Sequence, residues 1–155
     1  MYVRYHHDVV GVNSRLDSIQ AAVLNAKLPL LDGYNKARHE AAAKYSAALA
    51  NNAKIVTPFI EGTEDSHVFH QYVIRIIDAD RNALMQHLLD KGVPCAIYYP
   101  IPLHSQKAYA DSRYNEADFP VTNQLVNEVL ALPMHSELED DQIAFITDAI
   151  LEFLK

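Results

Sequence analysis

The sequence has little cysteine and no long apolar run. Its 155 residues contain one cysteine, Cys95, which excludes an internal disulfide and suits a reducing cytosol. No apolar stretch approaches the roughly 20 residues that a membrane-spanning helix needs, and residues 1–8 lack the apolar core of a signal peptide. From these absences we expect a soluble, cytoplasmic protein.

Basic charge is also scarce. The chain has 13 Lys and Arg against 20 Asp and Glu, its formal net charge is −7, and no run of basic residues occurs. This balance argues against nucleic acid or an anionic membrane surface as the main partner. Glycine-rich phosphate loops and a nucleophile beside a general base are absent as well. The residues alone therefore indicate a ligand-contacting or subunit-contacting domain without its own catalytic centre.

The residues that are present fit one folded domain over residues 1–155, because half of them are hydrophobic and only 21% are charged. Apolar residues at helical spacing predict two long helices, at about 14–28 and 34–51, with a break at Pro29 and a hinge at 30–33. The alanine-rich stripe of the second helix suits close packing against another helix, in the same domain or in a partner chain. That stripe comprises Tyr34, Ala37, Ala41, Tyr45, Ala48 and Leu49.

Strands and helices alternate in the rest of the chain. Runs of β-branched and aromatic residues predict the strands, and capped apolar stripes predict the helices. A predicted strand so close to the first residue leaves open that the chain is the C-terminal piece of something longer. We expect an α+β domain in which a small, mainly antiparallel sheet is covered by helices on one face and preceded by the two long helices. The predicted strands are 2–5, 67–77, 93–99 and 130–133, and the later helices are 81–91 (Leu84, Leu88 and Leu89 inward, Gly92 as the stop), 121–129 and 142–154.

A polar turn precedes the first long helix. Ser14 is the predicted N-cap, and an apolar stripe with Leu16, Ile19 and Val23 follows. Asn13 and Arg15 beside a helix N-terminus could hold an anion, since an amide, a guanidinium and free N–H groups converge there. On these residues alone, a capped surface helix with a solvated Arg15 is the favoured interpretation.

Two further groups of side chains could carry chemistry. Tyr98 and Tyr99 end a predicted strand, prolines stiffen the exit, and His104 and Gln106 follow. Such a loop suits a polar small-molecule ligand, but a tight turn at the domain rim explains it equally well. The pair His67-x-x-His70 invites a metal site; residues three apart on a strand point to opposite faces, so we predict none.

Taken together, the motifs resemble those of a known family. The chain is similar to the C-terminal domain of the DegT/DnrJ/EryC1/StrS aminotransferases, pyridoxal-phosphate (PLP) enzymes that aminate keto sugars attached to nucleotides. Five motifs occur in the family's order across nearly the whole chain. They are Gly11-x-Asn13-x-Arg15-Leu16-Asp17 with Gln20-Ala21-Ala22; Arg38 and Tyr45; His67-x-x-His70-x-Tyr72-Val73-Ile74-Arg75; Tyr98-Tyr99-Pro100-x-Pro102-Leu103-His104-x-Gln106; and Phe119-Pro120 with Glu128-x-Leu130-x-Leu132-Pro133-Met134-His135.

The resemblance implies a fold-type I homodimer whose large N-terminal domain holds PLP on a lysine. An amino group passes from glutamate to the sugar in such enzymes. The family lysine lies upstream of the Gly11 turn, and no lysine of this chain matches it. We therefore expect a C-terminal domain that contains no catalytic residue and is inactive alone.

The same resemblance gives roles to single residues. Asn13 resembles the asparagine that reaches the cofactor phosphate of the neighbouring subunit, and Arg15 the arginine near that phosphate and the substrate diphosphate. The segment with Tyr98, Tyr99, His104 and Gln106 lines the nucleotide-sugar pocket in relatives. The sequence of residues 15–20 most resembles that of the family branch that acts on UDP-linked N-acetylated 3-keto uronic acids. A non-catalytic dimerisation or ligand-binding domain and a metal-binding regulatory module are the alternative functions.

Overall fold

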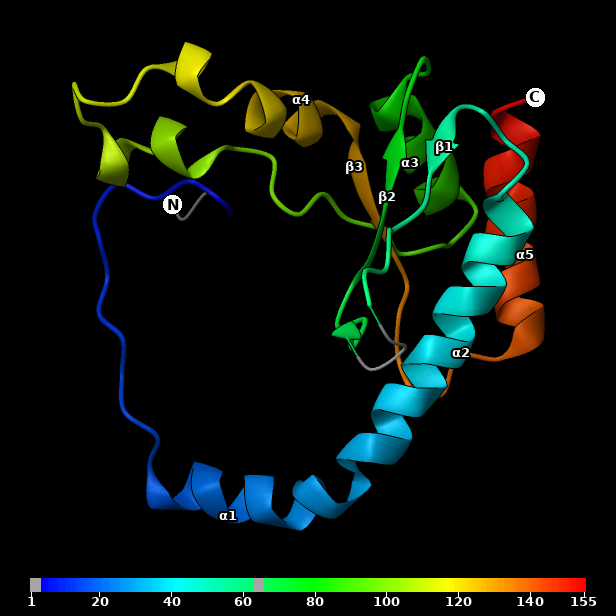
Figure 1. The fold of residues 1–155 in the computed structure, drawn as a ribbon, viewed down its shortest axis with the longest axis horizontal. Coiled ribbons are helices and arrows are strands. Elements are labelled where there is room, and N and C mark those ends of the chain that lie inside the picture. Colours follow the sequence, from blue (N-terminus) through cyan, green and yellow to red (C-terminus); the bar gives the residue numbers. More distant parts are fainter. Residues whose placement is uncertain (1–3, 63–65) are drawn as a thin grey trace.

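The structure, a computed structural model, describes residues 4–62 and 66–155. The chain follows an open C (Figure 1): an extended N-terminal segment leads to α1, α2 carries the chain to a small sheet, and residues 103–109 return to the N-terminal segment. None of the described helices is long and apolar enough to cross a membrane. The α-helices are α1 (Ser18–Lys27), α2 (Leu31–Leu49), α3 (Arg81–Asp90), α4 (Pro120–Glu128) and α5 (Asp140–Phe153), and the strands are β1 (Ile55–Val56), β2 (Tyr72–Ile76) and β3 (Val129–Leu132).

The sheet has the order β1-β2-β3, and both pairs are antiparallel. Ile55 lies opposite Ile76, and Tyr72 lies opposite Leu132. Alternate residues of β2 are buried on one face, as expected for a strand with period two. The predicted α+β class with a small antiparallel sheet is confirmed.

The buried face of the sheet shares one core with α2, α3 and α5. Two tyrosines lie at its centre: the rings of Tyr45 and Tyr72 stack with centroids 5.0 Å apart. Their hydroxyls keep partners inside the core, since Tyr45 donates to the Pro133 carbonyl and Tyr72 bonds to Ser46. Burial raises the pKa of both phenols. The core therefore holds neutral, hydrogen-bonded tyrosines.

The alanine-rich face of α2 packs within its own domain. Ala41 and Ala42 are buried in the core that α5 completes. Of the predicted stripe, Ala41, Tyr45 and Leu49 are buried, whereas Ala48 is exposed and Ala42 takes its place. The prediction for Ala48 was wrong because residues 41, 42, 45 and 49 form the buried face of α2, and Ala48 lies beside that face.

The other sheet face meets α4. Arg75 points away from the core and its guanidinium pairs with Glu128 of α4 at 2.7 Å. Arg81 at the start of α3 is buried and donates to the main-chain carbonyls of Val129 and Val126 at 2.7 and 3.2 Å. The guanidinium thus satisfies carbonyls at the C-terminus of α4, where the helix supplies no donor. These contacts fix the position of α4 against the sheet.

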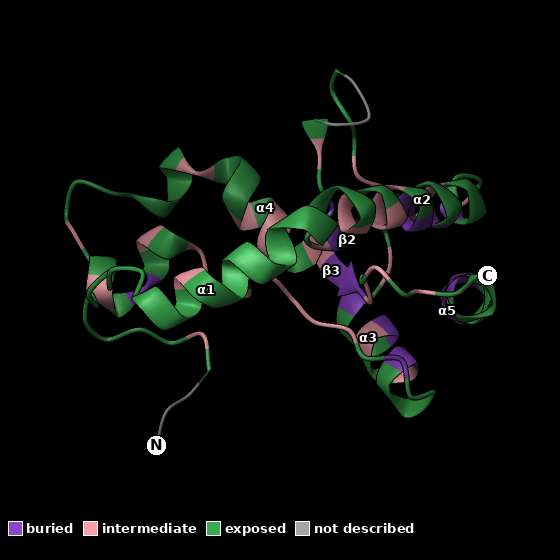
Figure 2. Ribbon diagram, turned by 90° about the horizontal axis from the view of Figure 1, so that it is seen from below, coloured by how far each residue is buried: buried purple, intermediate pink, exposed green. Residues whose placement is uncertain are grey.

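The first helix begins later than predicted. Asp17, and not Ser14, is the N-cap of α1, since its Oδ1 accepts a 2.8 Å bond from the Gln20 N–H. Pro29 does break the helix, into a 3-10 turn at Leu28–Leu30. Residues 30–33 form no hinge, because α2 starts at Leu31 and includes Gly33. The predicted apolar stripe lies in solvent, and α1 buries no residue (Figure 2).

Three strand predictions also change. The strand expected at 67–77 is confined to β2, because Phe69 has a positive φ of 45° and because Arg38 and His39 of α2, not a neighbouring strand, bind the carbonyls of Val68 and His67. The strand expected at 93–99 is reduced to one bridge between Ala96 and Ala131. The strand expected at 2–5 begins outside the described residues, and Arg4 and Tyr5 form a turn.

The predictions for α3 are mostly confirmed. Asp80 caps α3 by accepting from two N–H groups, Leu84 and Leu88 are buried, and Gly92 ends the helix with a φ of 78°. Leu89, predicted to point inward, is exposed because it lies beside Leu88 on the rim of the buried face.

Candidate functional site

The tyrosines of the loop predicted to bind a ligand surround a third tyrosine. Tyr5 meets the Tyr98 ring edge-on at 6.4 Å between centroids and the Tyr99 ring at 5.8 Å. The peptide bond between Tyr98 and Tyr99 is cis. Tyr99 is mostly exposed, whereas the Tyr5 hydroxyl is buried without a hydrogen-bond partner among the described residues. Three aromatic rings and one unpartnered hydroxyl therefore gather where the N-terminal segment meets this loop.

Gln106 is the most buried polar residue of this loop, with 7% of its surface exposed. Its Nε2 donates to the Tyr5 carbonyl at 2.8 Å, and its Oε1 accepts from the His7 N–H at 3.1 Å. Both polar ends of the amide are thus bonded to main chain nearly a hundred residues away.

His104 lies on the other side of the loop. Its ring stacks on Phe119, with centroids 4.2 Å apart and an angle of 16° between the planes. Its Nε2 is buried and has no hydrogen-bond partner among the described residues. A buried imidazole nitrogen without a partner can accept or donate one more hydrogen bond, so His104 has unused capacity to hold a polar ligand.

A cavity of about 520 Å³ separates this loop from α4. Tyr5, Tyr98, Tyr99 and Gln106 line one side, and Thr122, Leu125 and Val126 of α4 line the other. His104, predicted to bind a ligand with them, is not among the lining residues. This volume falls within the range of small-molecule pockets, and its mixture of aromatic, aliphatic and a few polar groups is typical of them.

Asn13 and Arg15 lie elsewhere. Both are exposed in the segment of irregular structure that leads to α1, and neither side chain has a hydrogen bond or ion pair within residues 4–62 and 66–155. Figure 1 shows this segment descending away from the loop at 103–109 towards α1. The chain by itself therefore does not bring Asn13 and Arg15 together with Tyr98, Tyr99, His104 and Gln106.

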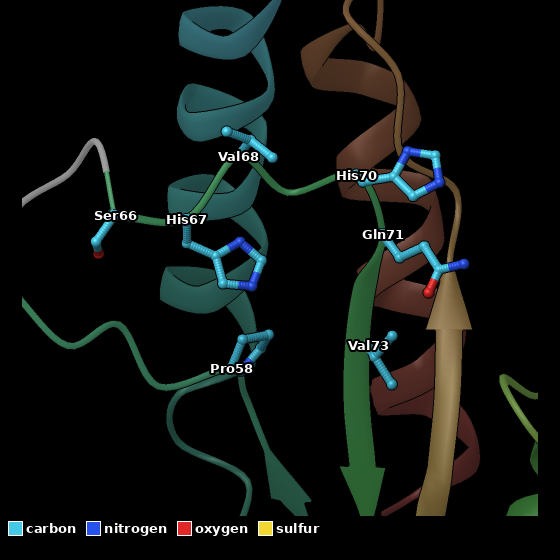
Figure 3. A pocket seen from close by; sticks show the side chains of 7 residues that line it. All are labelled: Pro58, Ser66, His67, Val68, His70, Gln71 and Val73. Carbon is cyan, nitrogen blue, oxygen red and sulfur yellow. The ribbon is translucent and has the colours of Figure 1, made fainter. Parts of the chain in front are cut away.

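The two histidines of the His67-x-x-His70 motif point apart. Figure 3 shows the His67 ring directed towards Pro58 and the His70 ring on the opposite side of the strand that follows. The reason given from the sequence was wrong, because these residues precede β2 and are not part of a strand. Within the described residues, no group of three or more His, Cys, Asp or Glu side chains could hold a metal ion.

The described side chains can be compared with what a PLP phosphate and a PLP lysine need. An exposed guanidinium and amide, Arg15 and Asn13, have free donors of the kind that bind a phosphate. A lysine amine becomes more reactive towards an aldehyde when an apolar pocket or a neighbouring cation lowers its pKa. All seven lysines are exposed or half-exposed, and four of them already bond to Asp140, Leu154, Glu152 or Asp8. Asn13 and Arg15 thus offer donors that a phosphate can accept, and none of the seven lysines lies in a buried pocket.

Two residues of this region were missed from the sequence. The sequence predicts a strand at Tyr5, and a helix start and a family motif at Phe119, but no contact of either residue with Tyr98, Tyr99 or His104. Their aromatic character was the available signal, but nothing in the sequence spacing indicates which distant aromatic residues meet.

Comparisons with known proteins agree with the motifs. A UDP-2-acetamido-2-deoxy-3-oxo-D-glucuronate aminotransferase of Pseudomonas aeruginosa is 42% identical over 147 residues, which are 95% of this chain and 39% of the relative. A UDP-N-acetyl-3-dehydro-alpha-D-glucosamine 3-aminotransferase of Acidithiobacillus ferrooxidans is 42% identical over 146 residues, 94% of this chain and 38% of the relative.

A solved structure and a family profile extend the match. The crystal structure of S. venezuelae DesV in complex with a ketimine intermediate has a TM-score of 0.83 and 34% identity, and covers 100% of this chain and 41% of that chain. The chain spans about two fifths of the length of the curated relatives it matches. The profile of the DegT/DnrJ/EryC1/StrS aminotransferase family matches residues 2–151. The chain therefore belongs to the DegT/DnrJ/EryC1/StrS aminotransferase family.

Proposed function

We propose that the chain forms the small C-terminal domain of a PLP-dependent nucleotide-sugar aminotransferase and does not catalyse transamination alone. The observation that carries the proposal is the 42% identity, over nearly the whole chain, to two aminotransferases of UDP-linked 3-oxo sugars. The exposure of the seven lysines supports the second part, because none lies in an apolar pocket of the kind that activates a lysine amine.

The proposed substrate is a UDP-linked 2-acetamido-3-oxo sugar, aminated at carbon 3 with glutamate as donor. Both UDP-sugar relatives carry a 3-oxo or 3-dehydro group in their names, and three dTDP-sugar relatives are named for 3-amino products. The working enzyme is proposed to be a homodimer, so that Asn13 and Arg15 meet a cofactor phosphate bound by the neighbouring subunit.

The chain's own residues bind and orient in this proposal. PLP, when bound, supplies the electron sink that transamination needs. Arg15 and Asn13 hold phosphate oxygens by charge-assisted and amide hydrogen bonds. Tyr98 and Tyr99 exclude water and pack on the nucleotide sugar in the cavity that they line.

A chimera tests the proposal directly. The chain replaces the matching segment of the Pseudomonas aeruginosa relative, and the aminated sugar nucleotide is measured by mass spectrometry with glutamate and the 3-oxo sugar as substrates. We expect turnover. Arg15→Gln should lower kcat/KM by about tenfold to a hundredfold, because a charged phosphate contact is lost. Arg113→Gln, which removes another exposed guanidinium, one that pairs with Asp111, should leave turnover unchanged. A folded chimera without turnover would contradict the proposal.

The unmodified chain tests its second part. PLP and borohydride are added to the purified chain, and labelled peptides are mapped. We expect no lysine to be labelled selectively, because all seven amines are accessible to water and none is desolvated. A reduced adduct on one lysine alone would show that the chain attaches the cofactor itself.

A further inference from the structure

Residues 5–8 form a strap that is tied to residues 98–108. The Tyr5 ring lies against Tyr98 and Tyr99, and the His7 carbonyl accepts from the Ala108 N–H at 2.9 Å. Asp8 pairs with Lys107 at 3.0 Å. Gln106 adds its two main-chain bonds, to Tyr5 and His7.

Gln106 is the main polar tie of this strap. Its amide places a donor and an acceptor side by side, so it pairs with the Tyr5 carbonyl and the His7 N–H as a neighbouring strand would. Both bonds are partly buried, and Gln106 itself is 7% exposed. The ion pair of Asp8 and Lys107 is exposed on both sides, and such pairs contribute little.

The strap is also the last anchor before the Asn13–Arg15 turn. Residues 9–17 are all exposed, and among the described residues no hydrogen bond holds residues 9–16. The next fixed point is the Asp17 cap of α1. The Asn13–Arg15 turn is therefore held only at its two ends, by the strap and by the Asp17 cap, and Gln106 contributes to holding the strap.

We infer that Gln106 is a positioning residue: it does not bind substrate but locks the strap to the tyrosine loop, and so fixes the anion-binding turn relative to that loop. The catalytic consequence rests on the proposed function, whereas the lock itself is a property of this chain. This role is assigned because both polar ends of the Gln106 amide are bonded to main chain, which leaves them occupied and not free for a ligand in the cavity.

Gln106→Glu provides a switchable test. When ionised, the introduced carboxylate still accepts from the His7 N–H but repels the Tyr5 carbonyl, so the strap is released. When protonated, the same group donates to Tyr5 and the lock is restored. Glutamine does not titrate, so only the variant should show this dependence on pH. Gln106→Met removes both bonds at every pH.

Amide hydrogen exchange on the whole 155-residue chain measures whether the strap is held against residues 98–108. In Gln106→Glu the protection factors of His7 and Ala108 should fall about tenfold or more at neutral pH and recover in acid. In Gln106→Met they should stay low throughout. Gln86→Glu, the same change on the exposed face of α3, loses a bond to Asp90 within that helix and should leave the protection of His7 and Ala108 as in wild type. Unchanged protection of His7 and Ala108 would overturn the inference. An equal loss at Ile74 and Leu130, or failure to fold, would show a structural role and also overturn it.

The chimera adds the catalytic readout. Gln106→Glu should lower kcat/KM by about tenfold at neutral pH through misplacement of the bound groups, with partial recovery in acid that Gln86→Glu lacks. A wild-type chimera without turnover would count against the proposed function, while the exchange measurement would still decide on the lock. Normal turnover in a variant whose strap is shown to be released would overturn the positioning role.

Discussion

Two regions of the molecule, the N-terminal arm and the domain around the sheet, differ in how they bury similar apolar side chains. The N-terminal arm, residues 4–30, leaves Val12, Leu16, Ile19 and Leu28 in solvent, and α1 has no buried residue. The sheet shares a buried core with α2, α3 and α5 (Figure 2). The difference lies in the partners available: the second half of α2 lies against α5, whereas within the described residues no α-helix packs along α1.

This contrast shows what an apolar stripe can predict. Helical spacing gives the direction of the apolar face but does not say what covers it. An exposed apolar surface of this extent is typical of a region that meets another part of a larger protein or a partner. The arm carries Asn13 and Arg15, so the least packed part of the chain is also the part with the proposed phosphate contacts.

The largest expected effect is in the core. Ile74 in β2 has no exposed surface, so Ile74→Ala should lower the free energy of unfolding by about 2–5 kcal/mol through lost burial and the cavity left behind. Ile19→Ala, the same change at a residue 80% exposed on α1, should shift it by less than about 0.5 kcal/mol. Urea unfolding followed by circular dichroism measures both. Equal losses in the two variants would abolish the distinction between the arm and the core.

Arg81 should come second. Arg81→Met removes the donors to the Val126 and Val129 carbonyls and should lower the free energy of unfolding by about 1.5–3 kcal/mol, because these charge-assisted bonds are largely buried. Arg81→Lys retains one charged donor group and should lose less. The urea titration serves again, and a Met variant as stable as wild type would show that water replaces the guanidinium without cost.

The pair of Glu128 and Arg75 should give a smaller, pH-dependent effect. The amide of Gln124 and then the guanidinium of Arg75 lower the pKa of Glu128. Because its pKa is lowered in the folded state, the Glu128 carboxylate stabilises the fold fully at pH values above its ordinary pKa. This stabilisation is lost as the pH falls through the lowered pKa. Glu128→Gln should therefore be less stable than wild type at neutral pH, and the two curves should converge in acid. A constant difference at all pH values would assign the effect to packing instead.

Local chemistry decided which parts of the fold could be predicted. Asp80, Gly92 and the apolar spacing of α3 act within a few residues, so its ends and most of its buried face followed from the sequence. The short β2 did not, because its start depends on Arg38 and His39 from a helix about thirty residues earlier. Likewise, His104 and Gln106 could be singled out from sequence, but the contacts of Gln106 to Tyr5 and His7 depend on tertiary folding.

The smallest expected effect is in the arm. Ile19 and Val23 are one helical turn apart on α1 and both exposed, so the double variant Ile19→Gln, Val23→Gln should change the free energy of unfolding by less than about 0.5 kcal/mol. Binding of an apolar dye such as ANS should fall at the same time, because the two changes remove part of the exposed apolar surface. Ala43→Gln on the exposed face of α2 controls for the added glutamine and should leave dye binding unchanged. A loss of stability above 1 kcal/mol, roughly twice the usual range for surface substitutions, would mean that α1 packs on the rest of the chain in solution. The arm would then be a closed part of the domain, and its apolar face could no longer be counted as free for another chain segment.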